Sequence, residues 1–240
     1  MTIAKKLEFC SIFSYCPRDD SKEGLLAKRL VNRIKGDKIM KVRKIIFESS
    51  EKEIKEIIRE IPASQYVAES VRKFVDKGYF TSYFKDADVI LVPIPRSTPI
   101  KKGQLWPSYQ IAMAMEKEKL GIVKTALLRI KPVQKSSLAP PSRRPKPKDH
   151  YESMRVNKLD LDLNDCDVLL VDDVVTRGHT FMGAYWRLIE AFPKVNVKSF
   201  AAVQTISNKS EFKKYIYPVE GIIYYRKDEG DCIRRTKRTY

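Results

Sequence analysis

The segment VLLVDDVVTRGHT, residues 168–180, places two adjacent carboxylates directly before a short polar loop. Its apolar start predicts a buried strand that ends at Asp172 and Asp173. Carboxylates in this position suit neutral hydroxyls or a metal ion. The following loop, TRGHT at residues 176–180, offers hydroxyl and backbone N–H donors that suit an anion.

The predicted helix that begins near residue 179 gives the loop a specific chemistry. Free N–H groups and the positive end of a helix dipole favour a phosphate monoester. Gly178 allows the backbone to approach closely, and Thr176 and Thr180 add hydroxyl donors. The segment therefore predicts a sugar-phosphate site, with the two aspartates on ribose hydroxyls and the loop on the 5-phosphate.

Three other interpretations of the acidic pair exist, and the first two fit the sequence poorly. A nucleotide-binding Walker B strand requires a G-x-x-x-x-G-K-[ST] loop, and the chain contains none. The acidic pocket of a receiver domain follows the first strand of the fold, whereas Asp173 lies in the last third of this chain. Two solvated aspartates at a strand end are the third interpretation.

The pattern of four apolar residues, two acids, two apolar residues and T-x-G-x-T resembles the signature of the type I phosphoribosyltransferases. The resemblance implies binding of 5-phosphoribosyl 1-pyrophosphate (PRPP) with Mg²⁺. It implies that Asp172 and Asp173 hold the ribose 2- and 3-hydroxyls, directly or through Mg²⁺. It also implies that residues 176–180, including Arg177 and His179, hold the 5-phosphate.

His179 occupies the variable position of this loop, and two interpretations are open for it. In one, its ring points outward and its backbone alone contacts the ligand. In the other, the ring is a second phosphate donor. Arg177 is a cation that suits a phosphate.

A second segment, ILVPIPRSTPIKKG at residues 90–103, is similar to the pyrophosphate loop of this family. Its V-P-I-P sequence with following basic residues resembles the ComF-like amidophosphoribosyltransferase branch. The resemblance implies that Arg96 and Ser97 meet the pyrophosphate. A solvated loop arginine is the alternative for Arg96.

Residues 129–155 hold eight Lys and Arg, two acids and five of the 13 prolines. This composition argues against a packed helix or strand between residues 131 and 153. Long loops of this kind are usually lids or binding loops, and the family has a flexible loop that folds over its site. A basic linker or nucleic-acid arm is the alternative. The candidate lid residues are Gln134, Lys135, Arg143 and Arg144.

Strands that alternate with helices predict an α/β fold with an open, mostly parallel, Rossmann-like sheet flanked by helices. The resemblance covers residues 88–206 and implies the type I phosphoribosyltransferase fold. The expected organisation is an N-terminal hood at 1–85, a PRPP-binding core at 86–210, and a C-terminal strand with a basic tail at 211–240. Phe9, Phe13 and Tyr15 in the hood suit core packing, or stacking on a base.

The local patterns predict the individual elements of this fold. A helix over 22–35 is expected to be capped by Ser21 and stopped by Gly36, and Ser64 is a candidate cap for a later helix. The other expected helices are 51–61, 65–78, 107–119 and 179–192, and the expected strands are 7–16, 38–47, 90–92, 122–130, 167–173, 197–206 and 221–225.

The formal net charge is +17, from 47 Lys and Arg against 30 Asp and Glu. This charge favours polyanions or small anionic substrates, or serves solubility alone. The chain has no 18-residue apolar run and no signal-peptide pattern, so we expect a cytoplasmic protein without a membrane segment. The four scattered cysteines do not form a zinc pattern, and we expect reduced, mostly buried thiols.

The expected activity is a PRPP-dependent transfer, in which a nitrogen nucleophile on a nucleobase-related acceptor displaces pyrophosphate from ribose C1. The alternative is a PRPP-binding regulator, or a protein associated with nucleic acid or a nucleic-acid enzyme, without transfer activity. A homodimer is left open. The basic tail supports the alternative through Arg226, Lys227, Arg234, Arg235, Lys237 and Arg238.

Overall fold

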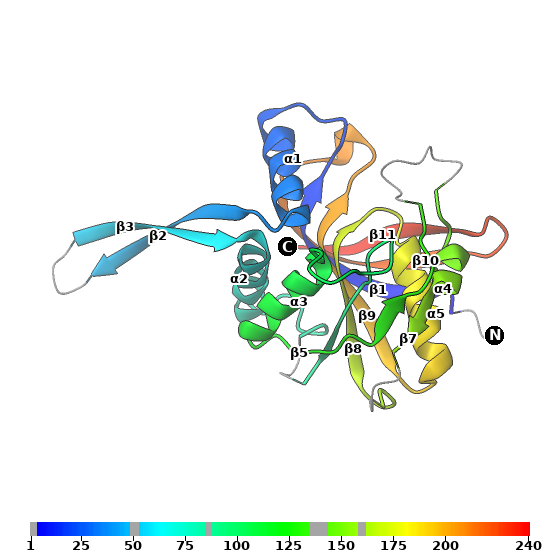
Figure 1. Ribbon diagram of the computed structural model, residues 1–240. Helices are drawn as coiled ribbons and strands as arrows, with labels where there is room; N and C mark the ends of the chain where they lie inside the picture. The colour runs from blue at the N-terminus through cyan, green and yellow to red at the C-terminus, as the bar shows by residue number, and fades with distance from the viewer. Residues whose placement is uncertain (1–3, 49–52, 85–87, 135–143, 158–161) are drawn as a thin grey trace.

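The computed structural model describes residues 4–48, 53–84, 88–134, 144–157 and 162–240 (Figure 1). Its centre is a seven-stranded sheet with the strand order β11-β10-β1-β9-β8-β4-β5. These strands are β1 (Lys6–Tyr15), β4 (Ile90–Pro93), β5 (Ile122–Val123), β8 (Asp167–Val175), β9 (Asn196–Thr205), β10 (Ile216–Arg226) and β11 (Asp231–Thr239).

Most of the sheet is parallel, because β1, β9, β8, β4 and β5 run in the same direction. β10 pairs antiparallel with β1, and β11 pairs antiparallel with β10. The predicted α/β class and mostly parallel sheet are confirmed. β1 lies inside the sheet, so strands from the three expected segments, 1–85, 86–210 and 211–240, belong to one sheet.

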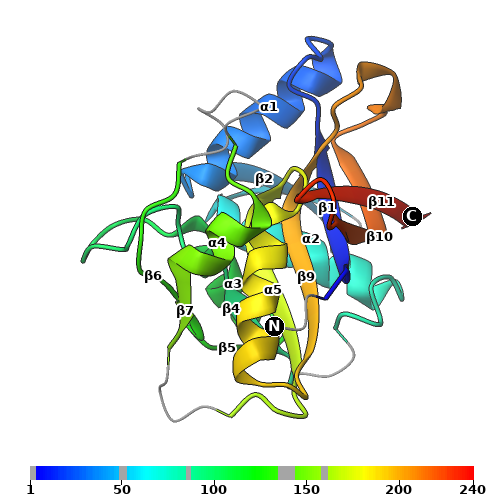
Figure 2. The same ribbon diagram turned by 90° about the vertical axis from the view of Figure 1, so that its right-hand side faces the viewer.

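Helices cover both faces of the sheet (Figures 1 and 2). Along β8, Leu169 and Val171 face the core on one side, and Val168 and Leu170 face the core on the other. Burial on both faces explains the continuous apolar run in this strand. One face packs on α1 (Lys22–Lys35), α2 (Ala63–Asp76) and α3 (Pro107–Lys117), and the other on α4 (Pro147–Ser153) and α5 (His179–Ala191).

The caps of the first two helices come from different sources. The Ser21 side chain accepts from Gly24 N–H at 3.2 Å, and Gly36 is the C-cap of α1, as predicted. The Ser64 cap is wrong, because α2 starts at Ala63 and Asp37 Oδ1 accepts from Ser64 N–H at 2.8 Å. A side chain distant in the sequence thus replaces the local cap.

The predicted helix at 51–61 is wrong, because residues 53–61 belong to β3 (Glu53–Pro62). β3 pairs antiparallel with β2 (Ile39–Glu48) in a two-stranded arm that extends from the body (Figure 1). Ile54, Ile57, Ile58 and Ile61 have helical spacing, but the backbone hydrogen bonds of the hairpin outweigh that local preference.

The segment 122–130 is two strands rather than the predicted one. β5 joins the central sheet, whereas β6 (Leu127–Arg129) pairs with β7 (Met154–Val156) in a separate small sheet. The expectation that residues 131–153 hold no packed helix is also wrong, because they include α4. Pro147 is tolerated at the start of this helix, where its missing N–H is not needed.

The basic C-terminal tail is the edge strand β11. Several of its cations have partners in the fold: Lys237 Nζ lies 3.6 Å from Glu8, and Arg234 Nη1 donates to Gln204 at 3.0 Å. Phe9 and Phe13 are fully buried on β1, so both pack in the core.

Phe200→Ala should lower the free energy of unfolding by about 3–5 kcal/mol, because Phe200 is fully buried on β9 and contacts Phe84 edge-to-face. Urea denaturation followed by circular dichroism measures this change. Ile58→Ala is the control, since Ile58 is 58% exposed, and should change stability by less than about 0.5 kcal/mol. Equal effects of the two substitutions would contradict this packing.

Candidate functional site

The carboxyl ends of β4, β8 and β9 meet at one edge of the parallel sheet, where ligands bind in open α/β folds. Two cavities of about 420 and 110 Å³ lie at this edge. Asp172 and Thr180 line both of them. The two cavities are therefore neighbouring parts of one site.

Asp172 and Asp173 both line the larger cavity, although neighbouring residues of a regular strand point to opposite faces. Each carboxylate folds back onto the chain: Asp172 Oδ1 accepts from Asp173 N–H at 2.9 Å, and Asp173 Oδ1 accepts from Val174 N–H at 2.8 Å. The strand end thus presents both acids to the same space.

The electrostatics of this edge centre on Asp172 and Arg129. Burial and the neighbouring Asp173 raise the pKa of Asp172 well above its usual range, and Arg129 partly opposes that shift. Burial lowers the pKa of Arg129 to about 10, so its guanidinium remains charged at neutral pH. The cavity therefore contains acids that are stabilised by an added cation or by hydroxyl donors.

The loop at residues 176–178 joins β8 to α5, and it places the first turn of α5 beside the smaller cavity. First-turn N–H groups have no acceptor within their own helix and are available to an anion. Gly178 has a left-handed φ of +90°, and an added Cβ would lie 2.7 Å from the Ile223 side chain. Both the conformation and the close packing on β10 require glycine.

The side chains of Arg177 and His179 are held by the protein itself. Arg177 Nη1 lies 2.9 Å from Asp231 Oδ2, and His179 Nε2 lies 2.5 Å from Asp231 Oδ1. His179 Nδ1 lies 2.8 Å from the Pro145 carbonyl oxygen. The His179 ring is buried, not outward. Both residues line the smaller cavity, and their side-chain nitrogens are engaged in these contacts.

Asp231 also forms ion pairs with Lys146 at 3.7 Å and with Arg226 at 3.5 Å, two residues from different parts of the chain. Burial raises the pKa of Asp231. Hydrogen bonds from His179 and Cys232 N–H and the charge of Arg177 lower it by more, so the pKa lies below its usual range. β11 thus fixes the loop after β8.

Arg96 and Ser97, after β4, line the larger cavity. The Arg96 carbonyl accepts from Arg129 Nε at 2.8 Å, and the Ser97 carbonyl accepts from Val133 N–H at 2.7 Å. Ser108 Oγ donates to the Ile94 carbonyl at 2.6 Å. Hydrogen bonds to three of its carbonyl groups therefore hold the loop at residues 94–97 in place beside the larger cavity.

Two of the four candidate lid residues lie within the described part of the chain. Gln134 lines the larger cavity, and Arg144 lines the smaller one. Lys135 and Arg143 lie outside the described residues. Gln134 and Arg144, which flank residues 135–143, therefore line different cavities.

Sequence reasoning missed four residues of the site. Arg129 gave one usable signal, because it is a charged residue within an apolar strand pattern. His150 lines the larger cavity with its pKa lowered to about 3, first by burial and then by Arg129 and His179, so its ring is neutral. Lys35 lines that cavity and Asp231 supports the smaller one, and both are distant from the motif in sequence.

The donor set at this edge suits Mg²⁺ in one particular way. Among the residues the structure describes, no three His, Cys, Asp or Glu side chains gather as a metal-ligand cluster. Mg²⁺, however, is commonly held by one or two carboxylates together with phosphate oxygens of the substrate. Asp172 and Asp173 in one cavity fit that arrangement.

No protein-family model matches the chain, and no curated protein matches it. None of the helices in the described ranges is long and apolar enough to cross a membrane.

Gly178→Ala should lower the free energy of unfolding by about 2–3 kcal/mol, because it combines a strained backbone with a clash against Ile223. Gly103→Ala is the matched control. Gly103 has a similar φ of +79°, but nothing lies within 4 Å of its added Cβ, so about 1 kcal/mol is expected. Urea denaturation measures both, and equal losses would contradict the close packing at residue 178.

Asp231→Asn should destabilise the protein by roughly 2 kcal/mol at neutral pH, because it removes the charge that pairs with Arg177 and weakens the hydrogen bond to His179. The pKa of Asp231 is lowered in the folded protein. Its stabilisation is therefore complete above the ordinary aspartate pKa of about 4 and is lost as pH falls through the folded pKa.

Unfolding curves between pH 7 and pH 3 should accordingly show the two proteins converging in stability at the acidic end. Asp228→Asn, at an exposed position in the turn before β11, should match the unsubstituted protein throughout. A stability difference that stays constant down to pH 3 would contradict the charge role of Asp231.

Proposed function

We propose that the protein is a PRPP-dependent phosphoribosyltransferase with the type I fold. The observation that carries this proposal is the pair of cavities that share Asp172 and Thr180. PRPP carries a monophosphate and a diphosphate at opposite ends of one ribose. A site with an anion-binding part on each side of two carboxylates suits that molecule.

The smaller cavity suits the 5-phosphate. The N–H groups of the first turn of α5 and the hydroxyls of Thr176 and Thr180 supply donors, and the helix dipole adds a favourable field. Arg177 is paired with Asp231, so backbone groups carry this role rather than the arginine head group.

The larger cavity suits the diphosphate. Arg96, Ser97 and the buried Arg129 line it, and Gln134 approaches from the 131–153 segment. Guanidinium groups match phosphate oxygens in geometry and charge. Arg129 has a second task, because its hydrogen bond to the Arg96 carbonyl holds the loop in place.

Between the two cavities, Asp172 and Asp173 face the position expected for the ribose hydroxyls. In the proposed reaction the bond from ribose C1 to the diphosphate oxygen breaks, and C1 forms a bond to the acceptor nitrogen. Pyrophosphate leaves with the electron pair of the broken bond. The acids stabilise the positive charge that develops on the sugar, and Arg96 and Arg129 stabilise the leaving group. Mg²⁺, held by these acids and the diphosphate, would add charge neutralisation.

Calorimetric titration with PRPP and MgCl₂ tests the role of the acids. Asp172→Asn/Asp173→Asn should weaken binding about 30-fold or more, because it removes charges in direct contact with the ligand and its cation. Asp165→Asn/Asp167→Asn is the matched control. It removes two acids at the opposite end of β8 and should bind as tightly as the unsubstituted protein.

Pyrophosphate release in the presence of a panel of nucleobases tests the transfer itself. We expect release that depends on PRPP, Mg²⁺ and one class of acceptor. Absence of PRPP binding would contradict the whole proposal. Tight binding without release from any acceptor would contradict the transferase function and favour a regulator that binds PRPP.

Fragments of PRPP test the assignment of the two cavities. Thr176→Val should weaken binding of ribose 5-phosphate about tenfold and leave pyrophosphate unaffected. Arg96→Gln should weaken pyrophosphate binding by a similar factor and leave ribose 5-phosphate unaffected. Each variant is the control for the other, and the reversed pattern would contradict the assignment.

A further inference from the structure

A strongly basic surface lies beside the larger cavity, and apart from Lys35 its residues line neither cavity. We call it the α1–β2 face, formed by residues 22–43. This segment holds eight Lys and Arg against two acids. The basic residues are Lys22, Lys28, Arg29, Arg33, Lys35, Lys38, Lys41 and Arg43, and all but the half-buried Lys28 are exposed.

The two acids of this segment leave the surface basic, because they offset only two of its eight positive charges and each also accepts a backbone hydrogen bond. Glu23 Oε2 accepts from Tyr215 N–H at 3.2 Å, and Asp37 Oδ1 accepts from Ser64 N–H at 2.8 Å. Lys28 pairs with Asp20 at 3.0 Å, and Lys41 pairs with Glu60 at 3.4 Å. The α1–β2 face keeps a net positive charge.

The helix geometry arranges part of this charge in a line. Lys22, Arg29 and Arg33 are seven and four residues apart, so they lie along one side of α1. The opposite side, including Ala27 and Val31, is buried. Among the residues the structure describes, Lys22 and Arg29 form no ion pair with a carboxylate.

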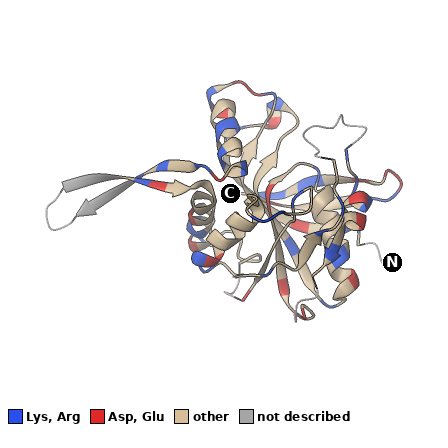
Figure 3. Cartoon of the chain, in the orientation of Figure 1, with Lys and Arg blue, Asp and Glu red and all other residues tan. Residues whose placement is uncertain are grey.

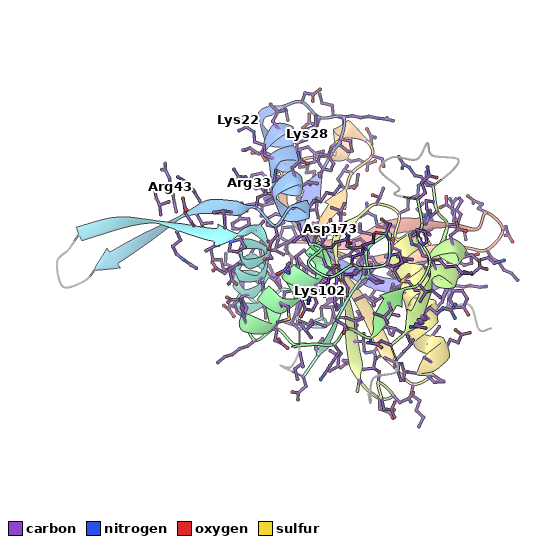
Figure 4. The ribbon with its side chains drawn as sticks, viewed as in Figure 1. Lys22, Lys28, Arg33, Arg43, Lys102 and Asp173 are labelled. Carbon is purple, nitrogen blue, oxygen red and sulfur yellow. The ribbon has the colours of Figure 1, made fainter. Side chains whose placement is uncertain are left out.

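The α1–β2 face also borders the larger cavity. Lys35, in the last turn of α1, lines the larger cavity together with Asp173. In the view of Figure 4, Lys22, Lys28 and Arg33 follow α1 toward Asp173, and Lys102 lies beyond it. Figure 3 shows the same concentration of Lys and Arg along α1 and the start of β2.

We propose that the α1–β2 face binds the phosphodiester backbone of a nucleic acid. A row of ammonium and guanidinium groups on one helix side matches a chain of phosphates and gains affinity by releasing counterions. Because the face borders the larger cavity, a bound strand lies beside the site proposed for PRPP. That last link, and with it a nucleic-acid acceptor, rests on the proposed function.

Other partners fit this surface less well. A helix that lies on a membrane turns its apolar side to the lipid, whereas the main apolar side of α1 is buried in the core. Protein interfaces are enriched in aromatic residues and depleted of lysine, and residues 22–43 include no aromatic residue.

Fluorescence anisotropy of the full chain with a labelled 20-nucleotide probe tests the proposal, without PRPP. Separate arms use single-stranded DNA, duplex DNA and single-stranded RNA. Lys22→Gln/Arg29→Gln/Arg33→Gln should reduce affinity on the order of 100-fold at about 50 mM salt, and lower the salt-dependence slope by about 2. The control variant Lys148→Gln/Arg155→Gln/Lys194→Gln removes the same charge from exposed positions outside residues 22–43 and should bind within about threefold of the unsubstituted protein.

Three results would overturn the proposal: no salt-dependent binding of any probe, equal losses in the two variants, or binding to anionic vesicles with none to the probes. Failure of the proposed function is distinguishable. The Asp172→Asn/Asp173→Asn variant should keep its affinity for the nucleic-acid probe, whatever its behaviour with PRPP.

Discussion

The burial of two adjacent carboxylates near the end of β8 is the constraint on which the rest of this edge depends. Asp172 and Asp173 share one cavity, and burial together with mutual repulsion raises the pKa of Asp172. The protein offsets this cost in part with the charge of buried Arg129 and with backbone N–H donors. A ligand that brings hydroxyl groups and a cation would offset the remainder.

A second carboxylate, Asp231, has the opposite role. It is surrounded by cations and keeps its charge, so it ties the C-terminal hairpin to the loop after β8. His179 extends this connection to the Pro145 carbonyl, within the 131–153 segment. Asp231 thus organises the cationic side chains around itself, whereas Asp172 and Asp173 remain available to a ligand.

The sequence predicted those parts of the structure whose signals are local. The apolar run of β8, the loop with Gly178 and the Ser21 cap depend on neighbouring residues, and the structure has each of them. The helix expected at 51–61 failed because hairpin pairing outweighed local spacing. Lys35 and Asp231 reach the site through tertiary packing, which no pattern in a single sequence specifies, and Arg129 is marked only by its charge within an apolar strand pattern.

The central claim is that one ligand with two phosphorylated ends spans the two cavities across Asp172 and Asp173. A crystal structure of the protein with PRPP and Mg²⁺ tests it most directly. The account predicts the monophosphate within hydrogen-bond distance of the backbone at residues 177–180, and the diphosphate beside Arg96 and Arg129. A ligand bound elsewhere, or in the reversed orientation with its diphosphate at the start of α5, would contradict it.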